Sequence, residues 1–508
     1  MYNMIKEELN NEKTFTENGA TAYRTSGTNL VDFHFAISSL RGATEAIIQN
    51  KFAKVFYDDR LTAIKFLFYV GDVRGGLGER HIFKSCFKWL VKNQVEIAQC
   101  VIELIPEYTR WDNMIAMLGE DVVTDATIIG IIRYQLAEDI ASMSAGNSIS
   151  LLAKWMPSEN TSSAKTREKA RLMMASLGIS ARDYRKTLSA MRKYLDVLEV
   201  KASANNWNEI NYEAVPSQAN LKYKNAFLKH DENRRKMFLE SLAKGEAKIN
   251  AGTLQCHEIV KDYIGRISWG IQECRPLDET LEELWKNLPD YDTGNAMVVR
   301  DGSGSMYSAS YSKTDVRPID VATGLAIYMA EHANGIWKDK FITFSNRPEI
   351  IDLTRGKNLR EKIDICLNEN DVANTNVEAT MELILNTAIK NNLKQEEMPE
   401  SIIIVSDMQF DYGCSRWDES LFDAIVRKYE ENGYKMPRLV FWNVDERTTT
   451  TIPMQRNELG LVLCGGFSTA VMKMFMSVEL DPYKILLEQI NSERYDLVEE
   501  KLSPMFEK

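Results

Sequence analysis

Five side chains that end in oxygen are placed where the chain could bind a metal ion. They are Asp301, Ser303, Ser305, Thr375 and Asp407. Carboxylates and hydroxyls are hard ligands, which suit Mg²⁺, Ca²⁺ or Mn²⁺ better than zinc. Two carboxylates and three hydroxyls leave a coordination position for water or for an oxygen of a ligand. The sequence therefore predicts a divalent cation site, with Mg²⁺ as the favoured ion.

The loops that contain these residues follow apolar segments. AMVV (296–299) runs directly into the loop RDGSGSM, and SIIIV (401–405) ends at Ser406 and Asp407. Thr375 stands just before a predicted helix. Side chains that follow parallel strands meet at the carboxyl edge of the sheet, so this spacing is expected to bring the five ligands together.

A sheet that provides this edge is predicted for the C-terminal part of the chain. After Leu288, short apolar segments alternate with amphipathic ones, which is typical of a mostly parallel sheet with helices on both faces. The predicted strands are 296–299, 341–344, 401–405, 438–444 and 460–464, and the predicted helices are 318–333, 378–391, 419–432 and 469–476.

The three loops resemble those of a known family. DGSGS (301–305), the threonine of NTN (374–376) and the later SD (406–407) are similar to the metal-ion-dependent adhesion site (MIDAS) of von Willebrand factor A domains. The resemblance implies a doubly wound, Rossmann-like α/β domain over residues 290–508. In such domains the metal completes its shell with an acidic group of a protein partner.

Two other interpretations of these loops stay open. DGSGS by itself is also typical of a surface turn, and an intact metal site can serve folding alone. Arg300 departs from the family pattern, which usually has an apolar residue there, and we expect it to form a local ion pair. No nucleophile stands in a motif with a partner base, so we expect a binding protein and no enzyme.

The preceding region is predicted to be all-α. Residues 29–289 show apolar residues at three- and four-residue spacing with brief polar turns, after an extension over residues 1–28. Ile82, Cys86 and Leu90 are one example of a buried stripe. Helix after helix without a strand pattern favours stacked hairpins of the HEAT-like kind, although the letters show no clean repeat.

Several phrases in this region resemble the Ro autoantigen family, whose helical part is the TROVE module. They include GDVRGGLGERHIF (71–83), YTRWDN (108–113) and YRKTLSAMRKYLDVLE (184–199), followed by the A-type domain. The match is better to uncharacterised relatives of Ro than to Ro itself. The resemblance implies a helical ring closed by the A domain, and a ribonucleoprotein that binds small structured or misfolded RNA.

The glycine-rich phrase GDVRGGLGE is not a phosphate-binding loop of the usual kind. It lacks the GK[ST] ending and does not follow a strand. We expect Arg74 and Arg80 to form structural pairs with carboxylates such as Asp72, Glu79 or Asp112.

A basic segment supports RNA as the partner. Residues 151–250 contain 19 lysines and arginines against 11 aspartates and glutamates, a formal charge of +8 within a chain whose total is −11. Such a block in an acidic protein is typical of a polyanion site, although basic helices are also ordinary solvated faces. The predicted RNA-binding residues are Lys165, Arg167, Lys169, Arg182, Arg185, Lys186, Arg192, Lys193, Arg234, Arg235 and Lys236.

The sequence thus favours a Ro-like RNA-binding protein with a metal-binding A domain. The first alternative is a metal-dependent protein-interaction scaffold with no RNA role, and the second is a metal-dependent hydrolase. Seven scattered cysteines without CxxC, and no signal peptide or apolar run long enough to cross a bilayer, predict a cytoplasmic protein without a membrane partner. A cellular or a viral source is left open.

Overall fold

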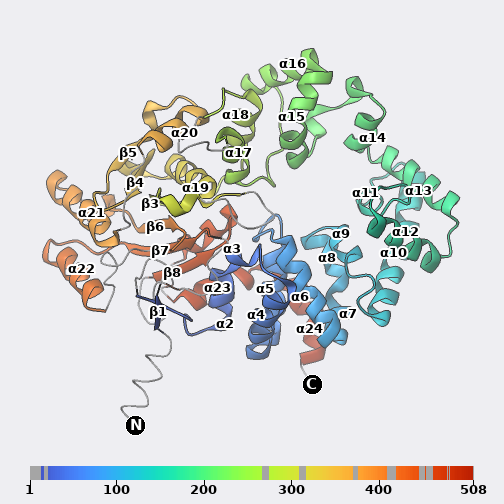
Figure 1. Cartoon of the computed structure of the whole chain (residues 1–508), viewed down its shortest axis with the longest axis horizontal. Helices are drawn as coiled ribbons and strands as arrows, with labels where there is room; N and C mark the ends of the chain where they lie inside the picture. The colour runs from blue at the N-terminus through green and yellow to red at the C-terminus, as the bar shows by residue number, and fades with distance from the viewer. Residues whose placement is uncertain are drawn as a thin grey trace, which may run out of the picture. The chain divides into compact units, whose positions relative to one another are not determined.

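The described residues form two compact units. The computed structural model describes residues 13–15, 21–265, 274–307, 316–369, 376–408, 419–445, 452, 461–477, 479 and 481–506. One unit, here the sheet unit, consists of Met1–Arg60 and Ala251–Ser492, and the other, here the helical unit, consists of Leu61–Asn250 and Glu493–Lys508. The boundaries between the units follow Arg60, Asn250 and Ser492, so they differ from the predicted boundary at residue 289. The bar in Figure 1 relates colour to residue number.

The sheet unit contains a six-stranded sheet in the order β5-β4-β3-β6-β7-β8 (Figure 1). All neighbours are parallel except β4 and β5, which are antiparallel. The strands are β3 (Ala296–Asp301), β4 (Lys340–Phe344), β5 (Ile350–Asp352), β6 (Ser401–Ser406), β7 (Arg438–Asn443) and β8 (Leu461–Gly465). The five predicted strands are confirmed, and β5 is an edge strand that the sequence did not indicate.

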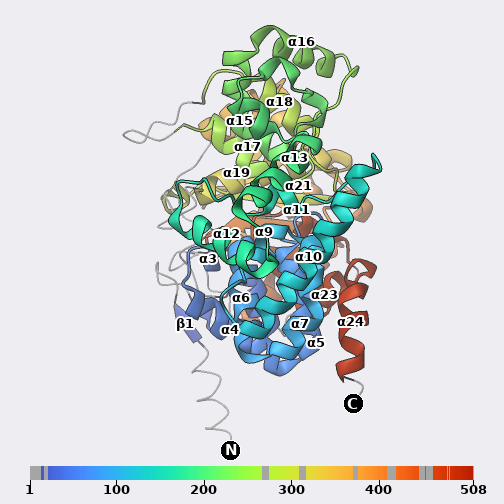
Figure 2. The ribbon, with the colours of Figure 1, turned by 90° about the vertical axis from the view of Figure 1, so that its right-hand side faces the viewer.

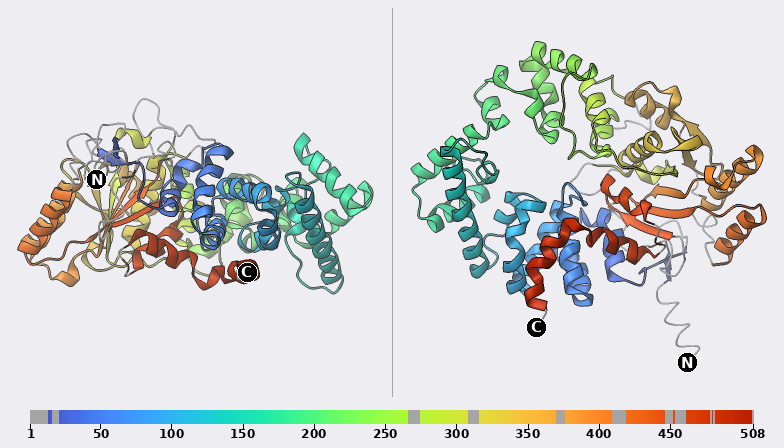
Figure 3. Two further views of the ribbon diagram at one scale, coloured as in Figure 1. Left: turned by 90° about the horizontal axis from the view of Figure 1, so that it is seen from below. Right: turned by 180° about the vertical axis from the view of Figure 1, so that it is seen from behind.

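Helices cover both faces of this sheet. On one face, Met297 and Ile404 share a core with Met381 of one helix and Tyr429 of another, while Arg300 on the opposite face hydrogen-bonds to Thr323. Figure 3 shows the orange helices α21 and α22 beside the strands. The segments are α19 (Pro318–His332), α20 (Leu359–Asn368), α21 (Val377–Asn391), α22 (Glu419–Glu431), the 3₁₀ segment η8 (Thr469–Met476) and α23 (Pro482–Ile490).

N-terminal residues complete the sheet unit at the β8 edge. α2 (Asn29–Phe35) packs on β8, and a Cβ on Gly465 would lie 2.4 Å from the Phe35 carbonyl oxygen, so the two backbones touch. Ser38 donates to the Asn443 carbonyl at 2.7 Å and accepts from the Gly466 amide at 2.8 Å. The other N-terminal segments are β1 (Lys13–Phe15), antiparallel to β2 (Thr21–Tyr23), α3 (Ile37–Leu40) and α4 (Glu45–Asp58).

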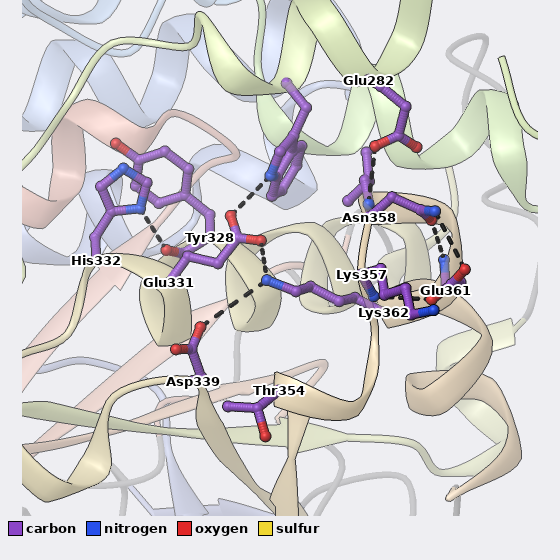
Figure 4. Close-up of polar contacts among 12 residues, drawn as sticks. Glu282, Tyr328, Glu331, His332, Asp339, Thr354, Lys357, Asn358, Glu361 and Lys362 are labelled. Carbon is purple, nitrogen blue, oxygen red and sulfur yellow. Dashed lines mark hydrogen bonds and ion pairs between the residues drawn. The ribbon is translucent and has the colours of Figure 1, made fainter. Parts of the chain in front are cut away.

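Two helices predicted to end the helical domain also pack within the sheet unit. They are α17 (Cys256–Tyr263) and α18 (Glu279–Lys286). Trp285 donates to Glu331 at 2.8 Å, and Glu331 also accepts from Lys362 at 2.7 Å (Figure 4). Glu282 accepts from the amides of Leu359 and Arg360, the first of α20, where a carboxylate is favoured by the helix dipole. These contacts explain why the structural boundary lies before α17.

The described residues of the helical unit contain no strand, as predicted (Figure 2). Consecutive helices pack in pairs, with Ser163 and Ser180 as side-chain N-caps of two of them. The helices are α5 (Arg60–Gly71), α6 (Arg80–Asn93), α7 (Val95–Val101), α8 (Ile105–Tyr108), α9 (Trp111–Ile115), α10 (Val122–Ser144), α11 (Leu152–Trp155), α12 (Ala164–Leu177), α13 (Ala181–Tyr194), α14 (Leu198–Ser203), α15 (Ser217–His230), α16 (Glu232–Ala243) and α24 (Asp496–Phe506), with short 3₁₀ turns between some of them.

The C-terminal segment belongs to this helical unit. The fully buried carboxylate of Asp72 accepts from Arg494 at 2.8 Å and from the Tyr495 hydroxyl at 3.1 Å. The Tyr108 hydroxyl donates to the Arg494 carbonyl at 2.7 Å. Both links fix α24 against residues more than 380 positions earlier in the chain. Among the helices searched, none combines the length and apolar character needed to cross a membrane.

Candidate metal site and basic surfaces

Four of the five predicted metal ligands end or follow β3 and β6, where the strand order of the sheet reverses. The first strand is β3, and the chain adds β4 on one side of it and β6 on the other. Asp301 ends β3 and Ser406 ends β6, with Arg300 and Val405 paired in the register just before them. Ligands of open parallel sheets bind at this position, outside the carboxyl ends of the two diverging strands.

The loop after β3 folds around the carboxylate of Asp301. The backbone amide of Ser303 donates to Asp301 Oδ1 at 2.9 Å, and the hydroxyls of Ser303 and Ser305 lie 3.1 Å apart. Both serines are half-buried, whereas Asp301 is fully buried. The loop therefore brings a carboxylate and two hydroxyls together on one short turn.

The end of β6 supplies a second carboxylate and an additional positioning group. The Ser406 hydroxyl donates to Asp301 Oδ2 at 2.5 Å and accepts from the Met408 amide at 3.1 Å. Asp407 follows directly and is fully buried. Ser406 was not among the predicted site residues, although its place at a strand end beside Asp407 was visible in the sequence.

The electrostatics of Asp301 fit a cation site. Burial raises the pKa of this carboxyl above its usual value, and hydrogen bonds from Ser406 and Ser303 oppose that rise. A buried carboxylate is costly unless a positive charge or donors compensate it. A hard divalent ion at this position would supply that charge, and the all-oxygen donor set suits it.

The fifth predicted ligand stands just before α21. Thr375 lies outside the described residues, and its neighbour Asn376 is the N-cap of α21, accepting from the Ala379 amide at 3.0 Å. Within the part of the chain that was searched, no three His, Cys, Asp or Glu side chains gather as a metal-binding group. The predicted set of two carboxylates and three hydroxyls is of another kind, so metal binding stays a prediction.

Arg300, which departs from the A-domain pattern, lies behind the site. Its side chain is buried on the opposite face of β3 from Asp301, because side chains alternate along a strand. Its Nε donates to the Thr323 hydroxyl on α19 at 3.1 Å. Its positive charge also lowers the pKa of Asp301, though by less than burial raises it.

A further acidic residue follows the next strand. Asp445 is buried just after β7, and its amide donates to Asn443 Oδ1 at 3.0 Å. Asn443 pairs with Ser406 in the register of β6 and β7. Asp445 thus shares the edge of the sheet with Asp301 and Asp407, and sequence reasoning did not single it out.

One predicted RNA ligand is a core residue of the helical unit. Arg235 is fully buried, and its guanidinium lies 5.1 Å from the ring centres of both Tyr212 and Phe227 and 5.3 Å from that of Phe238. Its Nη1 donates to Asn220 at 3.2 Å. The position falls on the buried face of α16, so we correct its prediction as an RNA ligand.

Four other predicted RNA ligands bind backbone carbonyls of the same unit. Arg192 donates to the carbonyls of Ala153 and Met156 at 2.8 and 2.7 Å. The other three bind carbonyls in the same way: Arg234 those of Trp207, Asn208 and Ile210, Arg167 those of Thr161 and Ser162, and Lys169 those of Ile115 and Ala116. These cations fix loops, which is a structural role.

Two more predicted RNA ligands form surface ion pairs. Arg185 pairs with Glu159 and Lys236 with Glu232, both at 2.6 Å.

The remaining four predicted ligands are Lys165, Arg182, Lys186 and Lys193. All are exposed, and none forms an ion pair with a described residue. The last three lie on α13 at intervals of four and seven residues, which places them within about 40° of one another around the helix axis. We call Arg182, Lys186 and Lys193 the α13 basic stripe.

The predicted structural pairing near the glycine-rich phrase is confirmed for one arginine. Arg80 Nη2 lies 3.1 Å from Asp112 Oδ2. Asp72 pairs with Arg494 and accepts from the Arg74 backbone amide at 2.9 Å.

Comparison with known proteins gives one relative along nearly the whole chain. Uncharacterized protein L728 of Acanthamoeba polyphaga mimivirus is 31% identical over 538 residues, which cover 95% of this chain and 90% of the relative. This chain belongs to the same protein family as that mimivirus protein. Its residues 295–505 match the model of a domain of unknown function (DUF7788), and residues 16–105 and 163–290 match that of another (DUF2828).

One solved structure also matches this chain. The crystal structure of the Deinococcus radiodurans Ro (RSR) protein matches this chain with a TM-score of 0.46 and 12% sequence identity. The match covers 89% of this chain and 99% of the Ro chain. The resemblance to an uncharacterised relative, indicated by the sequence, is confirmed by the mimivirus protein.

Proposed function

We propose that this chain is an RNA-binding protein whose sheet unit holds a divalent cation, most favourably Mg²⁺. The α13 basic stripe is the observation that supports RNA binding best. Its three cations point away from the buried face of α13, which carries Tyr184 and Leu188. Over the stripe the rise is about 16 Å, enough to follow several phosphates of a single strand.

The test is RNA binding by the purified, nuclease-treated chain across a salt series. Neutralising the stripe with Arg182→Gln, Lys186→Gln and Lys193→Gln should weaken binding of single-stranded and hairpin RNA. Because each phosphate contact contributes about 0.7 to the salt slope for single strands, the slope should fall by about 2.

A matched control removes the same charge from the sheet unit. Lys338, Lys390 and Lys435 are exposed and form no ion pair with a described residue, so their change to glutamine keeps the net charge equal. Equal weakening by both triple variants would point to a general charge effect and remove the stripe as the RNA surface. No binding of either RNA at low salt would remove the RNA proposal.

A second candidate function is supported by the arrangement of the predicted metal ligands. Asp301 and Asp407 stand at neighbouring strand ends, and the predicted ligands leave a coordination position open. In this alternative the cation bridges to an acidic side chain of a protein partner, and the helical unit is a scaffold. The chain is again a binding protein rather than an enzyme.

Mn²⁺ binding tests the metal site, because Mn²⁺ gives a direct paramagnetic signal. Asp301→Asn should abolish binding, while Asp290→Asn, a change at an exposed carboxylate of the same unit, should leave it intact. Equal Mn²⁺ binding by both variants would contradict a site at Asp301 and remove this alternative.

A further inference from the structure

The helical unit has a second row of cations, which the sequence did not associate with RNA. Arg80, Lys84, Lys88 and Lys92 recur every four residues along α6. Each step of four residues rises about 6 Å and turns about 40° past one full turn, so each side chain lies next to the one before it. The apolar side of α6, with Phe83 and others, is buried in the core.

At the start of this row, two arginines share one carboxylate. Arg110 donates to Asp112 through Nε at 2.8 Å and through Nη2 at 2.6 Å. Arg80 Nη2 reaches the same carboxylate at 3.1 Å. Lys84 is one turn further along α6, within electrostatic range of all three, and forms no ion pair with any described residue. Three positive charges therefore surround one negative charge.

Asp112 compensates only part of the positive charge of these cations. Burial, and then repulsion from Arg110, lowers the pKa of Arg80. Burial, and then repulsion from Arg80, lowers the pKa of Lys84. The Nε of Arg80 is buried and has no hydrogen-bond partner among the described residues. A buried donor without a hydrogen-bond acceptor lowers the stability of the protein. A bound ligand that accepts from this donor would recover that free energy.

Neighbouring groups fix the position of Arg110, and further lysines follow Lys84 along α6. Arg110 lies 3.9 Å above the ring centre of Trp155, which restricts its guanidinium to one plane. Further along the row, Lys88 and Lys92 share the single carboxylate of Glu120, at 3.2 and 3.1 Å. The row of cations thus continues along α6 beyond Lys84.

We infer that Arg80, Lys84 and Arg110 form a binding site for a phosphate group. Guanidinium groups supply paired planar donors and an ammonium supplies a point charge, and both match the oxygens of a phosphate. The phosphate could belong to an RNA backbone or to a free phosphate compound. Only the first of these sources depends on the proposed RNA binding. The inference does not depend on the α13 basic stripe.

A structural role for Lys84 would predict another outcome. If Lys84 served only folding, its removal would lower the stability of the protein. Because it has no ion-pair partner and is repelled by two arginines, we expect Lys84→Gln to leave the melting temperature unchanged or to raise it. Ligand binding should weaken in the same variant, and that combination distinguishes a binding residue from a structural one.

The experiment uses the full chain and inorganic phosphate as the first probe. Thermal unfolding is followed in phosphate and in chloride at equal ionic strength for four proteins: the natural chain, Lys84→Gln, Lys84→Arg and Lys244→Gln. Lys244 is an exposed lysine of the same unit without an ion-pair partner among the described residues, so it controls for charge. Phosphate should raise the melting temperature of the other three proteins by more than that of Lys84→Gln. Any general salting effect of phosphate remains visible in that variant.

Binding of single-stranded RNA by the same four proteins identifies the source of the phosphate. Weakening of about tenfold in Lys84→Gln alone, the loss of one charged hydrogen bond, would identify an RNA backbone. Loss of the phosphate response with unchanged RNA affinity, or with no RNA binding by any protein, would identify a free phosphate compound. The last result would also remove the proposed function while keeping this site. The same phosphate response in Lys84→Gln as in Lys244→Gln would overturn the inference.

Discussion

The orientation and the pKa of the Asp301 carboxylate are set by a few neighbouring groups. One of its oxygens accepts from a backbone amide of its own loop, and the other from Ser406 on the neighbouring strand. Arg300 on the reverse side of β3 adds a positive charge at short range. The two hydrogen bonds thus orient this carboxylate, which would reduce the ordering that binding of the proposed cation requires.

His34 gives a prediction about pH at the same scale. Burial lowers its pKa to about 4, partly opposed by a hydrogen bond with the Leu463 backbone. The unfolded chain therefore takes up a proton between about pH 6.5 and 4 that the native protein does not. Stability is present above this window and is lost as the pH falls through it, by about 2 kcal/mol at pH 5.

His34→Gln should reduce the loss of unfolding free energy between pH 7 and pH 5 by this amount. The measurement is chemical denaturation of the full chain at both pH values, with His81→Gln, a change at an exposed histidine, as the control. A pH dependence in His34→Gln equal to that of the natural chain would show that His34 is not responsible.

Which residues come together in the loop after β3 was easier to predict from the sequence than which cations remain at the surface, and the reason lies in single residues. Asp301, Ser303 and Ser305 are neighbours in the chain, so one short loop brings them together whatever the rest of the fold does. The direction of a basic side chain depends instead on helix phase and on distant carbonyls. Arg192 and Arg234 look like surface cations in the sequence. In the structure, however, they donate to backbone carbonyls of residues more than 25 positions earlier in the chain.

At the scale of elements, the phase of a helix separates binding residues from core residues. α13 and α16 both carry runs of arginine and lysine. On α13 the buried positions are apolar or aromatic, so three cations remain outside. On α16 the buried set includes Arg235 itself, which stabilises the helix against three aromatic rings.

Arg235→Met should therefore affect stability and not RNA affinity. The change removes three cation–π contacts and a buried hydrogen bond, and we expect a loss of about 2 to 3 kcal/mol in unfolding free energy. Denaturation curves for this variant and for Lys236→Met, its exposed neighbour, provide the comparison. A weaker RNA affinity at unchanged stability would mean that Arg235 reaches the ligand after all.

Element boundaries were predictable wherever a periodic pattern was long enough. The strands 401–405 and 438–444 were found within a residue of their observed ends. β5 was missed because three residues are too few to show alternation, and α20 was missed with it. The packing of α2 and α17 with the sheet could not be predicted, because an amphipathic pattern shows which face of a helix is buried but not which element covers that face.

On the scale of the whole chain, neither unit is a continuous segment. The sheet unit takes its first 60 residues from the N-terminus, and the helical unit takes its last 16 from the C-terminus. A fragment of residues 290–508, which the sequence suggests as an A domain, lacks α2, α17 and α18. It should expose apolar surface and unfold well below the full chain.

The comparison is with Met1–Arg60 joined to Ala251–Ser492 by a flexible linker. This version keeps every segment of the sheet unit, so we expect cooperative unfolding and no binding of a hydrophobic dye. Circular dichroism melts of both fragments decide between them. A cooperative melt of 290–508 at the same temperature would show that the N-terminal helices are dispensable.

The three crossings of the chain between the units also affect how the protein is made. A ribosome releases residues in order, and α2 has to wait for β8, more than 400 residues later, before its buried face is covered. The helical unit waits in turn for Arg494 to reach Asp72. Neither unit is complete until residues as late as β8 and Arg494 have left the ribosome. We therefore expect the nascent chain to need protection from aggregation until these residues have been made.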